Sequence, residues 1–356
     1  MEDRSFQFLK RLLDAPGPSG FETLAARVWR AEAETVSDRV VTDVQGNTLA
    51  TAGGGGPRVM LAGHIDEIGV MVTHVDDDGY LYIDGIGGWD PQVLVGQRIR
   101  FLTRKGEVVG VVGKKPIHLM KADEKEKSVK LSELWVDVGV RARADAEGRG
   151  IRVGDPGVVD AGVLELGNGM IASRAVDNRV GAFVVLEVLR ALREGGEHAA
   201  EVTAVATTQE EIGSNGGGAR TAAYDLDPQV ALVVDLTFAS DAPGVEKNQV
   251  GEHKLGSGPV LGRGSATHDL VFERLAETAE REGIPYTIQA NPRHTSTDAD
   301  AVYLQRAGVP TAVISVPNRY MHSPNEIVAL EDVDATIRLM AAFCRGIADD
   351  TDFMPR

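Results

Sequence analysis

The segment Arg58-Val59-Met60-Leu61-Ala62-Gly63-His64 is a short apolar run that ends on a histidine. Such a run is typical of a strand buried on both faces of a parallel sheet, so we expect it to deliver His64 at its carboxyl end. Further apolar runs alternate with segments of helical spacing. The expected strands are 202–207, 230–234, 286–289 and 311–315, and the expected helices are 180–192, 268–282, 299–307 and 333–347. This alternation predicts an α/β fold in which helices flank a mostly parallel sheet.

Residues 68–164 differ from the rest of the chain. Short β-rich segments, such as 80–83 and 108–113, alternate there with glycine and aspartate turns. This pattern is typical of a small, mostly-β domain. We therefore predict an α/β domain formed by residues 1–67 and 165–356, with a β-rich domain of residues 68–164 inserted into it.

The chain is acidic. Its 356 residues include 37 lysines and arginines against 53 aspartates and glutamates, which gives a net charge of −16. Because a negative surface repels phosphates, nucleic acid and anionic membranes are not expected partners. No apolar run approaches the roughly 20 residues that cross a bilayer. Residues 1–4 are polar, unlike the start of a signal peptide, so we expect a cytoplasmic protein.

The cysteine count excludes several chemistries. The single cysteine, Cys344, lies in an apolar helical pattern and is expected to be a buried small hydrophobe rather than a nucleophile. One cysteine cannot form an internal disulfide or a thiolate zinc site, so any metal must be held by histidines and carboxylates. No His-Glu-x-x-His motif occurs, so a thermolysin-like single-zinc protease is not expected.

Histidines and carboxylates occur where several expected strands end or helices begin, which is where open α/β sheets bind ligands. They are His64, Asp66, Glu67, Asp177, Glu210, Glu211, Asp235 and His322. Taken singly, each has an ordinary alternative as a loop histidine, a helix cap or a solvated helix start. Asp235 is harder to explain in that way, because a carboxylate buried after an apolar run needs a partner. Together these side chains suit zinc, cobalt or manganese.

Six motifs in order along the chain resemble the M42 metallo-aminopeptidases, the tetrahedral aminopeptidase group. They are Ala62-Gly63-His64-Ile65-Asp66-Glu67, Asp177-Asn178-Arg179, Gln209-Glu210-Glu211-Ile212-Gly213, Asp235-Leu236-Thr237, Thr297-Asp298-Ala299 and Arg319-Tyr320-Met321-His322-Ser323-Pro324. The resemblance covers essentially the whole chain, and residues 87–90 and 96–98 also resemble the family's inserted domain. It implies a zinc-aminopeptidase-like fold of the phosphorylase/hydrolase type.

The resemblance implies a site for two divalent ions, zinc or cobalt, with manganese also suitable. His64 and Asp235 would bind one ion, Glu211 and His322 the other, and Asp177 would bridge the two. The chemistry agrees, because a bridging ligand needs two oxygens for ions that lie about 3.5–4 Å apart.

The resemblance also implies roles for two residues that do not bind metal. Glu210 would be the general base, free to take a proton because its neighbour Glu211 is the ligand. Asp66 would hydrogen-bond His64 and fix its tautomer, as carboxylates beside metal-bound histidines usually do. The family's bridging aspartate is typically followed by a cis peptide, which is expected here between Asp177 and Asn178.

Two positions depart from the family pattern. Ser296 stands where a glycine usually precedes Thr-Asp-Ala, and the loop 214–218 is longer and richer in glycine. Both bear on loop shape and hence on side-chain preference. His118, in the inserted domain, is interpreted as structural or interfacial. The other histidines are expected to be surface or core residues: His74, His198, His253, His268 and His294.

The predicted function is hydrolysis of the N-terminal peptide bond of short peptides with a free N-terminus. In the resembled family the inserted domain forms dimers, which often assemble into tetrahedral dodecamers, so we expect a homodimer or that larger assembly. One alternative is an endoglucanase-type hydrolase, although a glycosidase needs two carboxylates and not two histidines. Another is a non-catalytic metal-binding assembly protein. Such a protein would be expected to have lost Glu210 or a ligand, and all are present.

Overall fold

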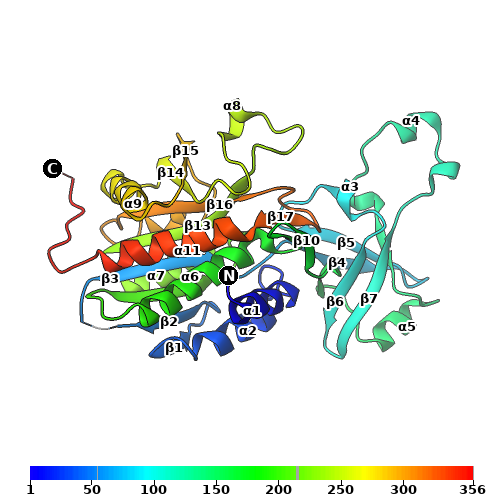
Figure 1. Cartoon of the computed structure of the whole chain (residues 1–356). Helices are drawn as coiled ribbons and strands as arrows, with labels where there is room; N and C mark the ends of the chain where they lie inside the picture. Colours follow the sequence, from blue (N-terminus) through cyan, green and yellow to red (C-terminus); the bar gives the residue numbers. More distant parts are fainter. Residues whose placement is uncertain (54, 214–215, 356) are drawn as a thin grey trace.

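A computed structural model describes residues 1–53, 55–213 and 216–355 of the chain. Within these residues, an eight-stranded sheet flanked by helices forms the larger part, and a smaller β-rich part projects from one end (Figure 1). The strands of the large sheet are, in spatial order, β1 (Arg39–Thr42), β2 (Thr48–Ala52), β12 (Glu201–Thr207), β3 (Arg58–His64), β13 (Val230–Phe238), β16 (Thr311–Asn318), β14 (Val260–Gly264) and β15 (Thr287–Asn291). The predicted α/β fold with a separate β-rich part is confirmed.

The centre of the sheet is parallel. Strand β3 pairs in parallel with β12 and β13, and β13 pairs in parallel with β16. Antiparallel pairs occur nearer the margins, between β2 and β12 and between β14 and β16. Parallel neighbours end at the same edge, so the carboxyl ends of these four central strands lie together, where α/β sheets bind ligands.

Helices cover both faces of the sheet, because successive residues of a strand point to opposite sides. Val59 and Leu61 of β3 belong to one core, and Met60 and Ala62 belong to the other. The first face carries α1 (Asp3–Asp14), α2 (Thr23–Ala33), α6 (Val176–Glu194), α9 (Asp269–Glu282) and α11 (Leu330–Arg345), and the second carries α7 (Gly217–Leu226) and α10 (Ala299–Val302). None of the helices in the described part of the chain has both the length and the apolar character needed to cross a bilayer.

The helix expected over 299–307 is shorter than predicted, because α10 ends at Val302. Farther along, Arg306 has a φ of 54° and Gly308 a φ of 104°. A right-handed helix requires negative φ, so it cannot continue through these residues. The apolar residues that suggested a helix over 299–307 therefore lie in a short helix followed by a turn.

The β-rich part is a closed barrel with its own apolar core. Its strands are β4 (Gly69–Val75), β5 (Leu81–Ile86), β8 (Trp135–Asp137), β7 (Gly106–Gly113), β6 (Arg98–Thr103) and β9 (Pro156–Val159). Val72, Ile99 and Phe101 are among its fully buried side chains. Short helical turns decorate this part: α3 (Pro91–Leu94), η1 (Ile117–Leu119), α4 (Ala122–Lys125), η2 (Leu131–Glu133) and α5 (Arg143–Gly148).

A small three-stranded sheet follows the barrel in the chain. It consists of β10 (Leu164–Gly167), β11 (Met170–Ser173) and β17 (Glu326–Ala329), with β11 between the other two. Strand β11 leads directly into α6, and β17 leads into α11. The remaining helix, α8 (Lys247–Val250), lies in the long connection between β13 and β14.

The burial of Cys344 predicts an unreactive thiol. The side chain is 0% exposed, and burial raises its pKa to about 12, so the thiolate that reacts with disulfides is scarce at neutral pH. We expect Ellman's reagent to leave the native protein unmodified and to titrate one thiol after denaturation. The Cys344→Ser variant is the blank. Rapid reaction of the native protein would contradict this burial.

Candidate metal centre

The carboxyl edge of the central sheet gathers two overlapping groups of potential metal ligands. His64 ends β3 and Asp235 lies near the end of β13, and with Asp177 they form one group. Asp177, Glu211 and His322 form the second. Within each group, one ligand atom from every residue lies within 4.8 Å of the others. The structure thus brings together all the residues predicted to bind metal, and Asp177 belongs to both groups.

The two carboxylate oxygens of Asp177 face two different histidines. Its Oδ1 lies 3.3 Å from His64 Nε2, and its Oδ2 lies 3.7 Å from His322 Nε2. Glu211 Oε2 is 3.2 Å from the same nitrogen of His322. A carboxylate that offers one oxygen to each side is the arrangement that a bridging ligand requires.

Asp177 is held at the start of α6 by its backbone. Its N–H donates to Glu326 Oε2 at 2.9 Å, and the N–H of His322 donates to the other oxygen of Glu326 at 2.7 Å. The peptide bond between Asp177 and Asn178 is cis, as the resemblance implied. The Asn178 amide donates to the carbonyl of Val234 at 2.8 Å, which ties the helix start to β13. Glu326 therefore positions two of the potential ligands, Asp177 and His322.

Asp66 connects His64 with the two glutamates. Its carboxylate accepts hydrogen bonds from the N–H groups of Glu210 at 3.2 Å and Glu211 at 3.1 Å, and from the Ser19 hydroxyl at 2.5 Å. Asp66 Oδ1 also lies 3.5 Å from His64 Nδ1. Burial would raise the pKa of Asp66, but the imidazole of His64 and these donors lower it below its usual value. An ionised Asp66 can therefore orient both His64 and the Glu210 backbone.

His322 is oriented in a similar way by the barrel. Its Nδ1 lies 2.9 Å from the carbonyl oxygen of Gly88, so Nε2 is left to face Asp177 and Glu211. A backbone carbonyl on the second ring nitrogen fixes the tautomer of a metal-binding histidine. The β-rich part therefore contributes directly to the geometry of the site.

The pKa values show that negative charge is crowded here. Burial raises the pKa of Glu210 to about 10, and the nearby carboxylates of Asp235, Asp298 and Glu211 add to the shift. Burial, reinforced by Asp177, likewise raises the pKa of Asp235 well above its ordinary value. Bound cations reverse such shifts, because they stabilise the ionised carboxylates.

Two buried carboxylate oxygens that accept no hydrogen bond in the described part of the chain point to the same need for cations. Among the described residues, Asp177 Oδ1 and Glu211 Oε1 are buried and have no hydrogen-bond partner. A buried carboxylate oxygen without a partner is costly, and a coordinated ion removes that cost. Histidine nitrogens with carboxylate oxygens are a suitable donor set for zinc, cobalt or manganese. The residues present therefore fit divalent metal ions.

A buried ion-pair network supports the loop that follows His64. Glu67 pairs with Arg174 and, at 3.0 Å, with Arg179, whose side chain is 0% exposed. Arg179 also donates to the carbonyls of Leu12, Ala15 and Ile65. Glu67 thus links α1, the β3 loop and α6 beneath the metal ligands.

The comparisons with known proteins agree with this geometry. A model of the M42 glutamyl aminopeptidase family matches residues 46–339. The lysyl aminopeptidase of Pyrococcus furiosus is 39% identical over 352 residues, which cover 98% of this chain and 99% of that protein.

The chain belongs to the M42 aminopeptidase family.

Solved structures of M42 relatives share the fold. A TET aminopeptidase from a marine-sediment thaumarchaeote is 35% identical, has a TM-score of 0.93 and matches over 97% of each chain. The TET1 peptidase of Pyrococcus horikoshii, which can assemble into a tetrahedron or a large octahedral shell, is 27% identical, with a TM-score of 0.84 over 96% of this chain and all of that one. This M42 protein is therefore a peptidase whose chain has the fold of the TET aminopeptidases.

Sequence reasoning passed over two buried acids at the site, Glu326 and Asp298. Glu326 precedes the apolar residues of β17, a context that also suits an ordinary strand end. Asp298 was noted only as part of a motif, although its carboxylate is 2% exposed and accepts a hydrogen bond from Thr207 at 2.5 Å. Burial raises the pKa of Asp298 to about 6. Neither acid stands out by spacing alone.

The remaining positions lie apart from the ligand groups. His118 is exposed in η1, and His253 is buried, with its ring nitrogens near Thr287 and Val250. Ser296 is exposed in a loop, where it adopts a φ of 55°, and its backbone N–H donates a hydrogen bond to the carboxylate of Asp300. Ser214 and Asn215, part of the second departure from the family pattern, lie outside the described residues.

The Glu67 network gives a stability prediction. In the Glu67→Gln variant, Arg174 and Arg179 keep buried positive charges without their carboxylate, so we expect a loss of about 3–5 kcal/mol of unfolding free energy. The matched control is Glu165→Gln, whose ion pair with Lys10 is solvent-exposed, with an expected change below about 1 kcal/mol. Urea denaturation measures both. Equal stabilities would contradict a structural role for Glu67.

Proposed function

We propose that this M42 enzyme is an aminopeptidase that uses two divalent metal ions to hydrolyse the N-terminal bond of short peptides. The observation that carries the proposal is the position of Asp177, whose two oxygens face His64 on one side and His322 on the other. His64, Asp177 and Asp235 would hold one ion, and Asp177, Glu211 and His322 the other. Zinc and cobalt are the proposed metals, and manganese suits the same donors.

When bound, such ions would polarise the scissile carbonyl and lower the pKa of the attacking water. Glu210 is proposed as the general base, since it belongs to neither ligand group and its Oε2 lies only 3.8 Å from His64 Nε2. It would take a proton from the water and return it to the leaving amine. Asp66 would hold Glu210 in place through the backbone N–H bond and would orient His64.

We propose a homo-oligomer in which residues 68–164 form the dimerisation domain. The support is the assembly of the TET1 relative into closed shells, together with apolar side chains exposed on the barrel. Val109 and Val111 are 46% and 50% exposed, and Ile117 and Leu119 are 59% and 69% exposed. Exposed apolar groups that cluster on one element commonly mark an interface. A dodecamer is the proposed larger assembly.

The alternatives differ in their dependence on metal. A glycosidase that works with two carboxylates retains its activity after chelation, whereas the proposed peptidase does not. A non-catalytic assembly protein binds metal but turns over no peptide. Chelation followed by metal addition therefore separates the three functions.

Replacing Glu210 should stop turnover without removing metal. We expect Glu210→Gln to lower kcat by at least about a hundredfold, because the amide cannot accept the proton of water. Metal content, measured by plasma mass spectrometry, should stay equal to that of the native enzyme. Activity is followed on aminoacyl p-nitroanilides after metal depletion and addition of zinc, cobalt or manganese.

Two results would count against this proposal. Full activity of Glu210→Gln would exclude the residue as the base. Metal binding by the native protein without turnover of any substrate with a free amine would favour the assembly protein. Glu165→Gln is the control and should retain native activity, because Glu165 is exposed and belongs to neither ligand group.

A further inference from the structure

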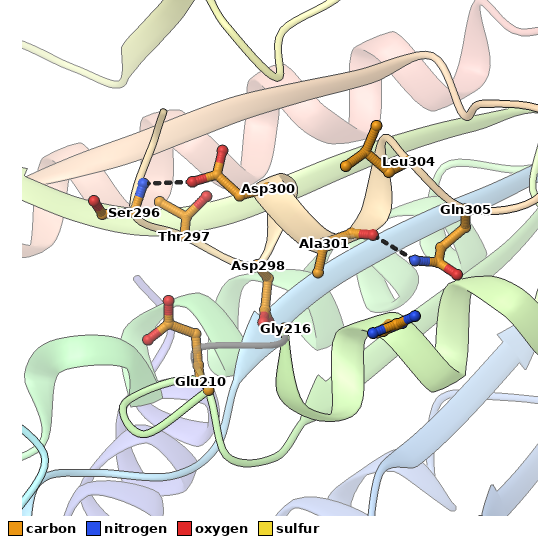
Figure 2. A pocket seen from close by; sticks show the side chains of 11 residues that line it. Glu210, Gly216, Ser296, Thr297, Asp298, Asp300, Ala301, Leu304 and Gln305 are labelled. Carbon is orange, nitrogen blue, oxygen red and sulfur yellow. Dashed lines mark hydrogen bonds between the residues drawn. The ribbon is translucent and has the colours of Figure 1, made fainter. Parts of the chain in front are cut away.

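Glu210, the proposed general base, forms part of the wall of a pocket of about 480 Å³ and depends on its backbone for its direction. Figure 2 shows its side chain directed from the loop after β12 toward the segment that holds Thr297 and Asp298. In the described part of the chain, its carboxylate accepts no hydrogen bond, and its one ion-pair contact is His64 Nε2 at 3.8 Å. The backbone at residues 209–211 therefore determines where this carboxylate lies.

The backbone at residues 209–211 forms a turn that needs a negative partner. Gln209 has a φ of 62°, in the left-handed region. A turn of this kind directs successive N–H groups to one side, where they bind an anion. Asp66 is that anion, because its Oδ1 accepts from the N–H of Glu210 at 3.2 Å and its Oδ2 from the N–H of Glu211 at 3.1 Å. A shift of Asp66 would therefore move the backbone that carries the base.

Ser19 holds Asp66 from a distant segment of the chain. Its hydroxyl donates to Asp66 Oδ2 at 2.5 Å, and the exposed fractions of the two residues are 2% and 0%. Both oxygens of the carboxylate are thus engaged, and its rotation would break at least one of these bonds. Because the pair is closed off from solvent, water cannot replace the hydroxyl if it is removed. Ser19 therefore fixes the orientation of the Asp66 carboxylate.

Ser19 is itself held in a rigid segment. Its N–H donates to the carbonyl of Glu67 at 3.1 Å, and the N–H of Glu67 donates to the carbonyl of Gly17, also at 3.1 Å. The neighbouring Pro18 packs so closely on Gly69 that a Cβ atom there would lie 2.6 Å from the proline side chain. These contacts join residues 17–19 to the loop after β3, so the hydroxyl is presented to Asp66 in a defined position.

Asp66 also binds the backbone of Glu211, but the two glutamates differ in their other contacts. Glu211 Oε2 lies 3.2 Å from His322 Nε2, within the second ligand group. The Glu210 carboxylate has no contact of that strength in the described residues. A displaced Asp66 would therefore affect the base more than the metal ligand.

We propose that Ser19 is a positioning residue for the general base, because its hydroxyl holds Asp66 and Asp66 holds the backbone of Glu210. The inference rests on the proposed aminopeptidase function. Ser19 belongs to neither ligand group, so it acts on the placement of the base that receives the proton of the attacking water. Its contribution should appear in kcat, with little change in KM or in metal content.

The first test compares Ser19→Ala with the native enzyme, both full-length and metal-loaded, on aminoacyl p-nitroanilides. We expect kcat to fall about tenfold, the effect of one hydrogen bond to a charged group, and KM to stay within about twofold. Metal content, measured by plasma mass spectrometry, should equal that of the native enzyme.

The matched control is Ser5→Ala. Ser5 is 6% exposed, and its hydroxyl donates to the buried carboxylate of Glu187 at 2.6 Å, in a contact between α1 and α6 that includes no potential metal ligand. Both variants lose a buried hydroxyl that bonds a carboxylate, so their urea midpoints should fall by similar amounts. Only Ser19→Ala should lose kcat.

Two further variants test whether Ser19 acts through Glu210. If it does, Ser19→Ala should lower the residual kcat of Glu210→Gln by less than about twofold, because residues that act as a unit are not additive. Ser19→Thr retains the hydroxyl, so its kcat should stay within about threefold of the native value. This variant also tests the hydrogen bond if Ser19→Ala does not fold.

Several outcomes would overturn the inference while leaving the proposed function intact. Native kcat in Ser19→Ala would show that the hydroxyl does not position the base. A tenfold fall in both the native and the Glu210→Gln backgrounds would show that Ser19 acts independently of Glu210. Loss of metal from Ser19→Ala would assign the residue to the ligands instead, and a folded Ser19→Thr enzyme as slow as Ser19→Ala would exclude the hydrogen bond. No turnover by the native enzyme would overturn the proposed function itself.

Discussion

The repulsion among buried carboxylates at one edge of the sheet is the constraint on which the rest of the structure depends. Asp177 lies within 4.8 Å of Asp235 in one ligand group and within 4.8 Å of Glu211 in the other, all three are largely shielded from water, and two of their oxygens lack hydrogen-bond partners among the described residues. Burial and mutual repulsion raise the pKa values of Glu211 and Asp235. Like charges in a low-dielectric site are stabilised either by protons or by cations. The two histidines in the same groups make divalent cations the better solution.

The fold supplies this cluster through its topology. Parallel strands β3 and β13 end side by side and present His64 and Asp235, while α6 begins at the same edge and presents Asp177. Residues outside the ligand groups then fix the directions of the ligands. Asp66 binds the backbone of both glutamates, Glu326 binds the backbone of Asp177 and His322, and the barrel carbonyl of Gly88 meets His322. The barrel is therefore joined to the chemistry of the site as well as to the proposed oligomer interface.

Much of this arrangement could be predicted from the sequence. Apolar runs that end on His64 and Asp235 predict buried strands that deliver ligands, and the motifs around Asp177, Glu211 and His322 complete the set. Contacts between distant segments could not be predicted in this way. The pocket beside Glu210 is lined by Glu210, Gly213, Gly216 and Arg220 and by residues of the segment 296–305, and no periodicity relates these distant parts of the chain. The shortness of α10 and the burial of Asp298 likewise follow from tertiary packing, which overrides local spacing.

The central claim is that Asp177 bridges a pair of metal ions. Anomalous X-ray diffraction from crystals of the zinc-loaded protein, recorded on both sides of the zinc absorption edge, tests this claim most directly. The account predicts two anomalous peaks about 3.5–4 Å apart. One peak should lie against His64 and Asp235, the other against Glu211 and His322, with one Asp177 oxygen on each. A single peak, or two peaks that Asp177 does not join, would contradict it.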